Sequence, residues 1–218
     1  NKLTLKLKKS EEIIAFADTS YFYGKMGAGK TSIARLIDYC FGGDFEYSPA
    51  LQQEFVSVSL ELSINENSLI ITRPRDAASV IASFSAWEEK FSLVVPIAAG
   101  EEVIPDSGIE NISDFIFFLS GMKPPKVRKS KAKEDSDLQR LSIRNLFWYC
   151  YLDQDEIDSD FFHLGKDANT WKRLASRDVV RFVIGFHQEK VSELEESLAE
   201  LRDRRRSLNA AASTLRDV

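Results

Sequence analysis

The stretch of sequence that decides the fold is Gly24-Lys25-Met26-Gly27-Ala28-Gly29-Lys30-Thr31. It satisfies the pattern G-x-x-x-x-G-K-[ST], in which the glycines let several backbone N–H groups point into one concavity that holds phosphate oxygens. Lys30 supplies a positive charge between β- and γ-phosphates, and the Thr31 hydroxyl is a ligand for Mg²⁺. The stretch therefore predicts a loop that binds ATP together with Mg²⁺.

The sequence on both sides of this loop gives it the expected setting. Two apolar runs with strand-like composition, residues 13–16 and 21–23, precede it, and residues 31–41 follow with apolar side chains at helical spacing up to Gly42-Gly43. A helix that begins at the loop directs the positive end of its dipole toward a bound anion. We therefore expect nucleotide contacts from Gly24, Lys25, Gly27, Ala28, Gly29, Lys30, Thr31 and Ser32.

Alternating patterns farther from the loop predict strands. Leu3, Leu5 and Leu7 alternate with polar residues, which indicates a half-buried N-terminal strand. Residues 55–95 contain four further runs of this kind, the first two separated by a turn at residues 65–67. This second region therefore predicts a β-meander.

The second half of the chain predicts helices and a loop instead of strands. Residues 112–119 predict a helix capped by Asn111 or Ser113, and residues 168–186 predict one or two more helices. Residues 122–137 have almost no apolar content and predict a solvated loop, with contact between its basic side chains and DNA phosphate as the alternative.

The C-terminal residues carry a heptad seam with apolar positions spaced alternately three and four residues apart. Its members are Val191, Leu194, Leu198, Leu201, Arg205, Leu208, Ala212 and Leu215. A repeat of 3.5 residues sustained over this length favours a coiled coil over a lone amphipathic helix. Because the pattern continues to the last residues, we expect residues 187–218 to be the truncated start of a longer coil.

The charge balance limits the functions that the chain can have. There are 29 Lys+Arg against 34 Asp+Glu, a net charge of -5, which argues against a dedicated nucleic-acid coat. Any DNA contact must come from a local basic patch or from parts of the protein outside this chain. No apolar run approaches the roughly 20 residues that a membrane-spanning helix needs, so we expect a cytoplasmic protein with no membrane partner.

Four side chains outside the loop allow a simple interpretation. Cys40 and Cys150 lie in apolar contexts without metal-ligand spacing, so we expect two buried free thiols in a reducing compartment. Arg73 and Arg75 flank Pro74 at the end of an expected strand. Contact with phosphate or DNA and ordinary exposure at a strand end both remain open for these two arginines.

The order of these features resembles the N-terminal lobe of the SMC/RecN/SbcC group of ABC-type ATPases. In that group, two half-heads from opposite ends of one chain are brought together by an antiparallel coiled coil. The likeness in layout covers all 218 residues, and its sharpest part is the loop. The family usually reads G-x-N-G-[SA]-G-K-[ST], and Met26 stands here in place of the Asn. Because phosphate is held mainly by backbone groups, this departure does not put nucleotide binding in doubt.

A second motif match is the segment Tyr151-Leu152-Asp153-Gln154-Asp155-Glu156-Ile157. By resemblance it is the Q-loop, in which Gln154 would act as a Mg²⁺ ligand and catalytic residue, since an amide ligates through oxygen and donates through nitrogen. Residues 147–152 followed by Asp153 also fit the apolar strand and Mg²⁺-binding aspartate of a Walker B motif. The Q-loop interpretation is favoured, because a Walker B motif of this family continues with a catalytic glutamate where Gln154 stands.

The resemblance implies an α/β fold of the P-loop NTPase type. It would be an ABC-type, SMC/SbcC-like head lobe with a β-meander subdomain, a helical lobe and a coiled-coil stub. Residues 1–186 would form the N-terminal lobe of the head, and residues 187–218 the start of the coil. Lys30 and Gln154 would be the catalytic residues, with Thr31 and Gln154 as Mg²⁺ ligands.

The resemblance also implies an ATPase that depends on partners. These would be the C-terminal half of its own head, a second copy of the head, DNA, and a nuclease or effector subunit. The setting would be DNA repair, chromosome maintenance or defence against phages and plasmids, and the divergent loop and basic segment are similar to what an SMC-like subunit of a Lamassu-type defence system would carry. The alternative is a signalling or sensor ATPase whose coil scaffolds an effector without binding DNA.

Overall fold

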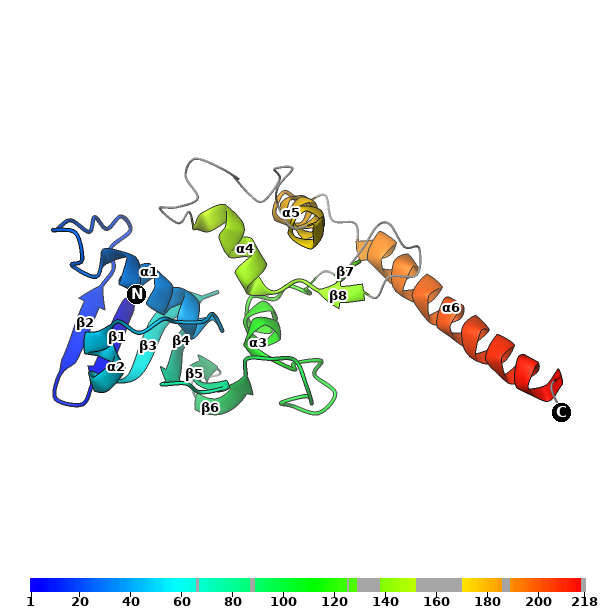
Figure 1. Ribbon diagram of the computed structural model, residues 1–218, viewed down its shortest axis with the longest axis horizontal. Coiled ribbons are helices and arrows are strands. Elements are labelled where there is room, and N and C mark those ends of the chain that lie inside the picture. Colours follow the sequence, from blue (N-terminus) through cyan, green and yellow to red (C-terminus); the bar gives the residue numbers. More distant parts are fainter. Residues whose placement is uncertain are drawn as a thin grey trace. The chain divides into compact units, whose positions relative to one another are not determined.

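The computed structural model describes residues 1–65, 67–86, 89–124, 126–128, 138–151, 170–185 and 189–216 (Figure 1). The chain divides into two compact units, residues 1–123 and 124–218. The first unit contains the glycine-rich loop and the predicted meander. The second contains the predicted helical segment and the heptad seam.

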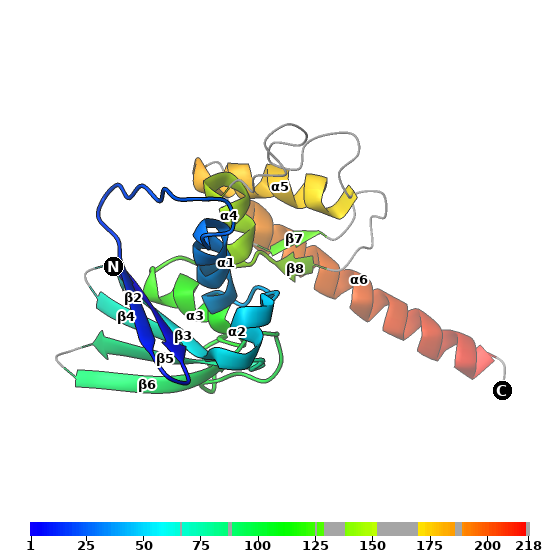
Figure 2. The ribbon, with the colours of Figure 1, turned by 60° about the vertical axis from the view of Figure 1, so that its left-hand side comes forward.

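The first unit is built on a six-stranded antiparallel sheet in the order β2-β1-β3-β4-β5-β6 (Figure 2). The strands are β1 Lys2–Leu7, β2 Glu11–Ala15, β3 Phe55–Ile64, β4 Asn67–Pro74, β5 Ser79–Ala86 and β6 Glu89–Pro96. The meander predicted over residues 55–95 is confirmed as β3 to β6. The N-terminal strand and the run at residues 13–16 are confirmed as β1 and β2.

Alternation along these strands puts apolar side chains on one face of the sheet. Leu60, Ile71 and Ala82 are cross-strand neighbours in β3, β4 and β5, and all three are buried. Residues between them, such as Ser59 and Thr72, lie on the opposite face and are joined by a 2.9 Å hydrogen bond between their hydroxyls. The core of the unit therefore lies against a single face of the sheet.

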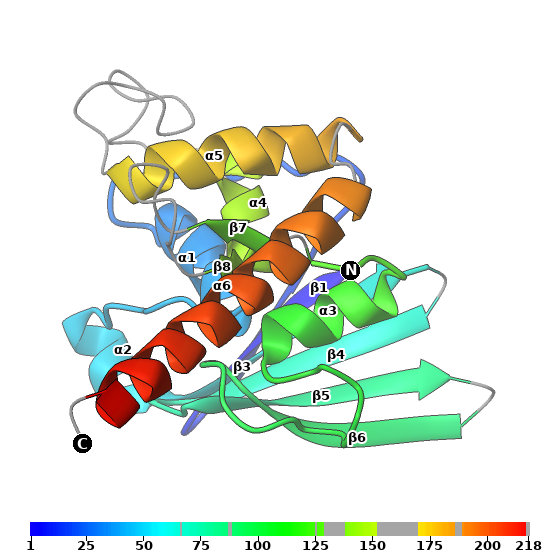
Figure 3. The ribbon, with the colours of Figure 1, turned by 90° about the vertical axis from the view of Figure 1, so that its right-hand side faces the viewer.

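Two helices cover that face. Helix α1, Lys30–Cys40, begins at Gly29 and confirms the helix predicted over residues 31–41. Helix α3, Ile112–Leu119, lies over the other end of the sheet (Figure 3). There the centre of the Phe115 ring lies 5.3 Å from the centre of the Phe84 ring of β5. Asn111 caps α3 by accepting from the backbone N–H groups of its first turn, so Asn111 was the correct choice of the two predicted caps.

Two local features differ from expectation. A short helix, α2 Pro49–Glu54, precedes β3 and is capped by Ser48, whose hydroxyl accepts from the Leu51 N–H at 3.4 Å. The strand predicted at residues 21–23 is wrong for the described structure, since these residues form no strand. The physical reason is that no described strand lies beside them to complete a ladder, because the backbone turns away after Phe16.

The second unit begins with a two-stranded hairpin. Strands β7 Lys126–Arg128 and β8 Leu138–Arg140 pair antiparallel, so part of the region predicted as a loop at residues 122–137 is a strand. Helix α4, Ile143–Cys150, and helix α5, Thr170–Val183, then pack together, and α5 lies within the predicted helical range 168–186. Their shared core consists of Leu141, Ala175 and Val179, with Leu146, Trp148 and Tyr149 packed against it.

Helix α6, Glu189–Arg216, contains the heptad seam. The helix predicted in this region is confirmed over residues 189–216, while its pairing into a coiled coil stays a prediction. Four leucines of the seam are exposed, namely Leu194, Leu198, Leu201 and Leu208. No helix within the described ranges is long and apolar enough to cross a membrane.

Candidate functional site

The glycine-rich loop takes a conformation that its glycines make possible. Gly27 and Gly29 have φ values of 81° and 82°, in the left-handed region that other residues rarely adopt. A Cβ built on either residue would meet nothing within 4 Å, so backbone conformation and not lack of space explains the two glycines. Gly29 is also the N-cap of α1, so the loop turns directly into the helix.

The ammonium group of Lys30 closes the loop from inside. Its Nζ donates to the backbone carbonyls of Gly24 and Lys25, each at 2.9 Å. The Ala28 N–H donates to the same Lys25 carbonyl at 3.2 Å, which tightens the turn. The lysine that the sequence assigns to phosphate therefore lies at the centre of the loop, next to the start of α1.

The start of α1 is suited to an anion. No side chain caps this helix end and its first turn holds no acidic residue, so the N–H groups of the first turn carry the positive end of the helix dipole uncompensated. Thr31 is exposed in this turn. These donors fit the oxygens of a triphosphate, and the Thr31 hydroxyl fits one coordination position of a Mg²⁺ bound to it.

The far end of α1 is held by Arg73 of β4. This guanidinium is buried, with 7% of the residue exposed, and it donates to the Tyr39 and Gly43 carbonyls at 2.7 and 2.5 Å and to the Ala77 carbonyl at 3.3 Å. It also lies 3.7 Å from the centre of the Tyr39 ring. Arg73 thus satisfies carbonyls at the end of α1 that the helix itself leaves without donors. Of the two interpretations left open for Arg73, contact with phosphate or exposure, neither is correct.

The backbone beyond α1 has no room for a side chain at Gly43. A Cβ there would lie 2.0 Å from the Asp38 carboxylate and 3.0 Å from the Asp38 carbonyl. The Gly43 N–H donates to that carbonyl at 2.9 Å, and Gly42, with φ of 98°, makes the turn. The glycine pair therefore does more than stop the helix: it brings the chain close enough for Arg73 to bridge the two segments.

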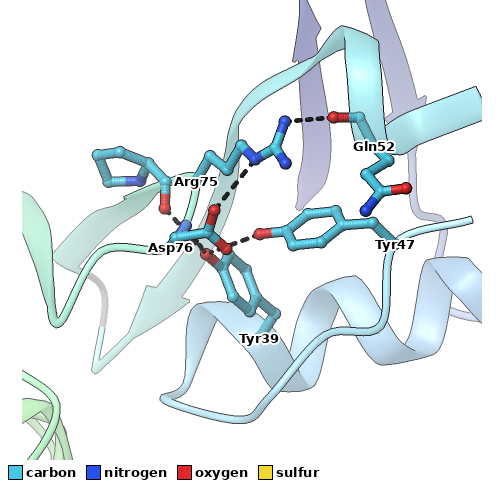
Figure 4. A network of polar contacts seen from close by, with 6 residues as sticks. Tyr39, Tyr47, Gln52, Arg75 and Asp76 are labelled. Atoms are coloured by element: carbon cyan, nitrogen blue, oxygen red, sulfur yellow. Dashed lines mark hydrogen bonds and ion pairs between the residues drawn. The ribbon is translucent and has the colours of Figure 1, made fainter. Parts of the chain in front are cut away.

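A polar network extends from this point to α2 (Figure 4). The Tyr39 hydroxyl donates to the Pro74 carbonyl at 2.9 Å and accepts from the Asp76 N–H at 3.1 Å. Arg75 pairs with Asp76 at 3.1 Å and also donates to the Gln52 carbonyl. Arg75 is consequently a partly exposed residue with a structural role in joining β4 to α2.

Tyr47 completes the network. Its hydroxyl donates to the Tyr39 hydroxyl at 3.3 Å, and its ring lies 5.1 Å from the Arg75 guanidinium. Burial, followed by the hydrogen bond to Tyr39, raises the pKa of the Tyr47 hydroxyl above its usual range. The Tyr47 hydroxyl therefore stays protonated and keeps its hydrogen bond to Tyr39 across the physiological pH range, and the network connects α1 and α2 to the end of β4.

The predicted site residues separate into two groups. Residues 24–32 are contiguous and form the loop and first turn of α1 described above. Gln154 and Asp153 lie outside the described residues. Within the described ranges, no group of three or more His, Cys, Asp or Glu side chains is placed to hold a metal ion. The Mg²⁺ expected at Thr31 would therefore need its other ligands from the nucleotide, water or residues elsewhere.

The Walker B alternative meets a direct obstacle. It requires a strand over residues 147–152, but residues up to Cys150 form helix α4, whose first turn is capped by reciprocal hydrogen bonds between Ser142 and Asn145. The strand interpretation of this run is therefore wrong. The prediction of two buried thiols is also half wrong, because Cys40 is buried and Cys150 is exposed at the end of α4.

No protein-family model matches the chain, and no curated protein matches it.

Proposed function

We propose that this chain binds ATP and Mg²⁺ through residues 24–32 and is the N-terminal half of an SMC/SbcC-like ATPase head. The observation that carries the proposal is the position of Lys30, whose Nζ lies 2.9 Å from the Gly24 and Lys25 carbonyls at the uncapped start of α1. A cation inside a curled glycine loop beside a helix dipole is the arrangement that polyphosphate recognition needs.

Each part of the loop would have its own task. Backbone N–H groups from Gly27 to Ser32 would bind phosphate oxygens, and Lys30 would exchange its two carbonyl acceptors for phosphate. Bound Mg²⁺ would neutralise charge on the β- and γ-phosphates and favour phosphoryl transfer to water. Thr31 would hold the metal, and Gln154 is proposed as a further ligand that couples the nucleotide to the helical lobe.

The exposed residues just before the loop support the proposal that this chain needs the C-terminal half of the head. Tyr21 is 86% exposed and Tyr23 is 95% exposed, although neighbouring aromatic side chains favour a buried strand. We propose that the C-terminal half of the head covers these exposed aromatic side chains. Hydrolysis would then require this half and a second copy of the head, and the assembled heads would engage DNA.

Replacing Lys30 with alanine should weaken ATP–Mg²⁺ binding by the full-length protein about 10- to 100-fold, because the loop loses its only inward cation. Lys9→Ala is the matched control, since it removes the same charge from an exposed residue outside the loop. Isothermal titration calorimetry with ATP compares the variants. Equal affinity for the wild-type protein and Lys30→Ala would show that the site is wrong.

The seam of α6 should need a partner helix. Its positions include Arg205 and Ala212, which weaken an apolar seam, and its leucines are exposed. A peptide of residues 187–218 is therefore expected to be largely unfolded at low concentration by circular dichroism. The Arg205→Leu peptide should gain helix with rising concentration because it completes the seam. A wild-type peptide with stable helix content at every concentration would contradict this prediction.

A further inference from the structure

Helix α5, whose course Figure 3 shows, carries a row of arginines along one side. Arg173, Arg177 and Arg181 follow one another at intervals of four residues, so they lie on one side of the helix with a rise of about 6 Å between neighbours. The helix packs through its other side, where Ala175 and Val179 are buried. Arg177 and Arg181 are exposed and Arg173 is half-buried. We call these three residues the arginine row.

The arginine row is not neutralised by its own helix. Four basic residues and one acidic residue occupy α5, within a chain that has more acidic than basic residues overall. The one acidic residue, Asp178, pairs with Arg181 at 3.2 Å. Arg173 and Arg177 have no ion-pair partner in the part of the chain that the structure describes. Like charges four residues apart weaken a helix slightly, and a bound polyanion would remove that repulsion.

The chemistry of the row favours phosphate. A guanidinium presents paired N–H donors that match two oxygens of one phosphate, whereas lysine offers a single point charge. Three guanidinium groups fixed at regular intervals on a rigid helix suit a ligand that repeats its charge regularly. Single-stranded sites interleave basic residues with aromatic side chains that stack on bases, and no aromatic residue on the described part of this row does so.

We propose that the arginine row of α5 binds the phosphate backbone of double-stranded DNA without reading its sequence. The choice of DNA as the polyanion rests on the proposed function. The geometry of the row is independent of the nucleotide site, so the two can fail separately. Contacts of this kind give affinity that falls steeply with salt.

The test is fluorescence anisotropy of the full-length protein with a short labelled duplex of mixed sequence, repeated over a series of salt concentrations. The variant R173Q/R177Q/R181Q removes the row while keeping residues of similar helix propensity. The matched control is K6Q/K8Q/K9Q, which makes the same charge change at three exposed residues around the end of β1.

The row variant should bind the duplex at least about tenfold more weakly at about 0.1 M salt, and its log–log salt slope should fall by about 2 to 3, near 0.9 for each lost phosphate contact. The control should stay within about twofold of the wild-type protein, which is the range expected when only net charge has changed. Circular dichroism and ATP binding should be unchanged in both variants.

Each other outcome has a definite meaning. A row variant with wild-type affinity and salt slope would overturn the proposal, and Lys30-dependent ATP binding would still support the ATPase. A wild-type protein that binds ATP but no duplex would overturn it as well, and would favour the signalling alternative. Row-dependent binding of single strands or duplex RNA in preference to duplex DNA would also count against it. If ATP binding did not depend on Lys30 while DNA binding still depended on the arginine row, only the assignment of the nucleotide site would be wrong.

Discussion

Replacing Arg73 with alanine is expected to lower the free energy of unfolding of the first unit by about 3 kcal/mol. The substitution removes the side-chain donor to the carbonyls of Tyr39, Gly43 and Ala77 in a region that is largely closed to water, although the Tyr39 carbonyl keeps its bond from the Gly42 N–H. It also removes the guanidinium from the face of the Tyr39 ring, where cation–π attraction adds to the hydrogen bonds. Urea denaturation followed by circular dichroism measures the change.

Arg75→Ala is the matched control for this experiment, because it removes an arginine two residues away, just after the end of the same strand. The Arg75 side chain is 35% exposed and pairs with a more exposed Asp76, so we expect the free energy of unfolding to fall by about 1 kcal/mol or less. The loss in Arg73→Lys should lie between these two values, since a lysine keeps the charge but not the fork that reaches several carbonyls. A larger effect at Arg75 than at Arg73 would contradict the role assigned to Arg73.

The parts of the fold that depend on local pattern could be predicted from the sequence. Strands β3 to β6 show two-residue alternation, and α1 follows the glycine loop with helical spacing. Both signals lie within a few residues of the element that they define. The same is true of the loop, where the left-handed backbone at Gly27 and Gly29 is what the spacing of glycines indicates.

Helix α4 shows where a local pattern is ambiguous. Residues 147–152 form a short apolar run, and such a run fits a buried strand as well as a helix when periodicity alone is considered. The deciding signal lies just upstream, where Ser142 and Asn145 cap each other's backbone at the start of the helix. The cap identifies the run as the end of a helix and removes the strand that a Walker B motif needs.

The predictions for Arg73 and for residues 21–23 were wrong for a different reason. The partners of Arg73 at the end of α1 and just beyond it lie 34 and 30 residues away, so nothing near Arg73 in the sequence marks it as the residue that caps this helix. Residues 21–23 have strand-forming side chains, but a strand needs a neighbour to hydrogen-bond, and no described strand supplies one. Both outcomes depend on tertiary contacts, which local patterns in the sequence do not reveal.

Cys40 is expected to react with a thiol reagent at least about a thousand times more slowly than Cys150. Cys40 is fully buried at the end of α1, and burial raises the pKa of its thiol from 9.0 to about 12, while the nearby Arg73 charge acts in the opposite direction. A rise of that size lowers the reactive thiolate about a thousandfold at any pH below 9. Cys150 is exposed. Labelling of the C150S and C40S variants at pH 8 measures the two rates separately.

The pH dependence follows from the direction of the shift. Because the folded-state pKa is raised, the contribution of the neutral Cys40 thiol to stability is complete below about pH 9 and is lost as the pH rises toward 12. Urea denaturation of the wild-type protein should therefore show falling stability in this range, and C40S should show a smaller fall. Equal pH profiles for the two proteins would contradict the buried position of Cys40.

The same thiol would report on the proposed nucleotide binding, because α1 begins at the glycine-rich loop and ends at Cys40. A ligand that binds the folded loop stabilises α1 against opening by the factor 1 + [L]/Kd, so ATP–Mg²⁺ at about 100 times its Kd should slow Cys40 labelling up to about 100-fold. The protection should disappear in the variant that also carries Lys30→Ala and persist in the one that carries Lys9→Ala. If ATP binds with the expected Lys30-dependence but leaves the Cys40 rate unchanged, the nucleotide does not act through α1, and its effect on the partner half must travel by another element.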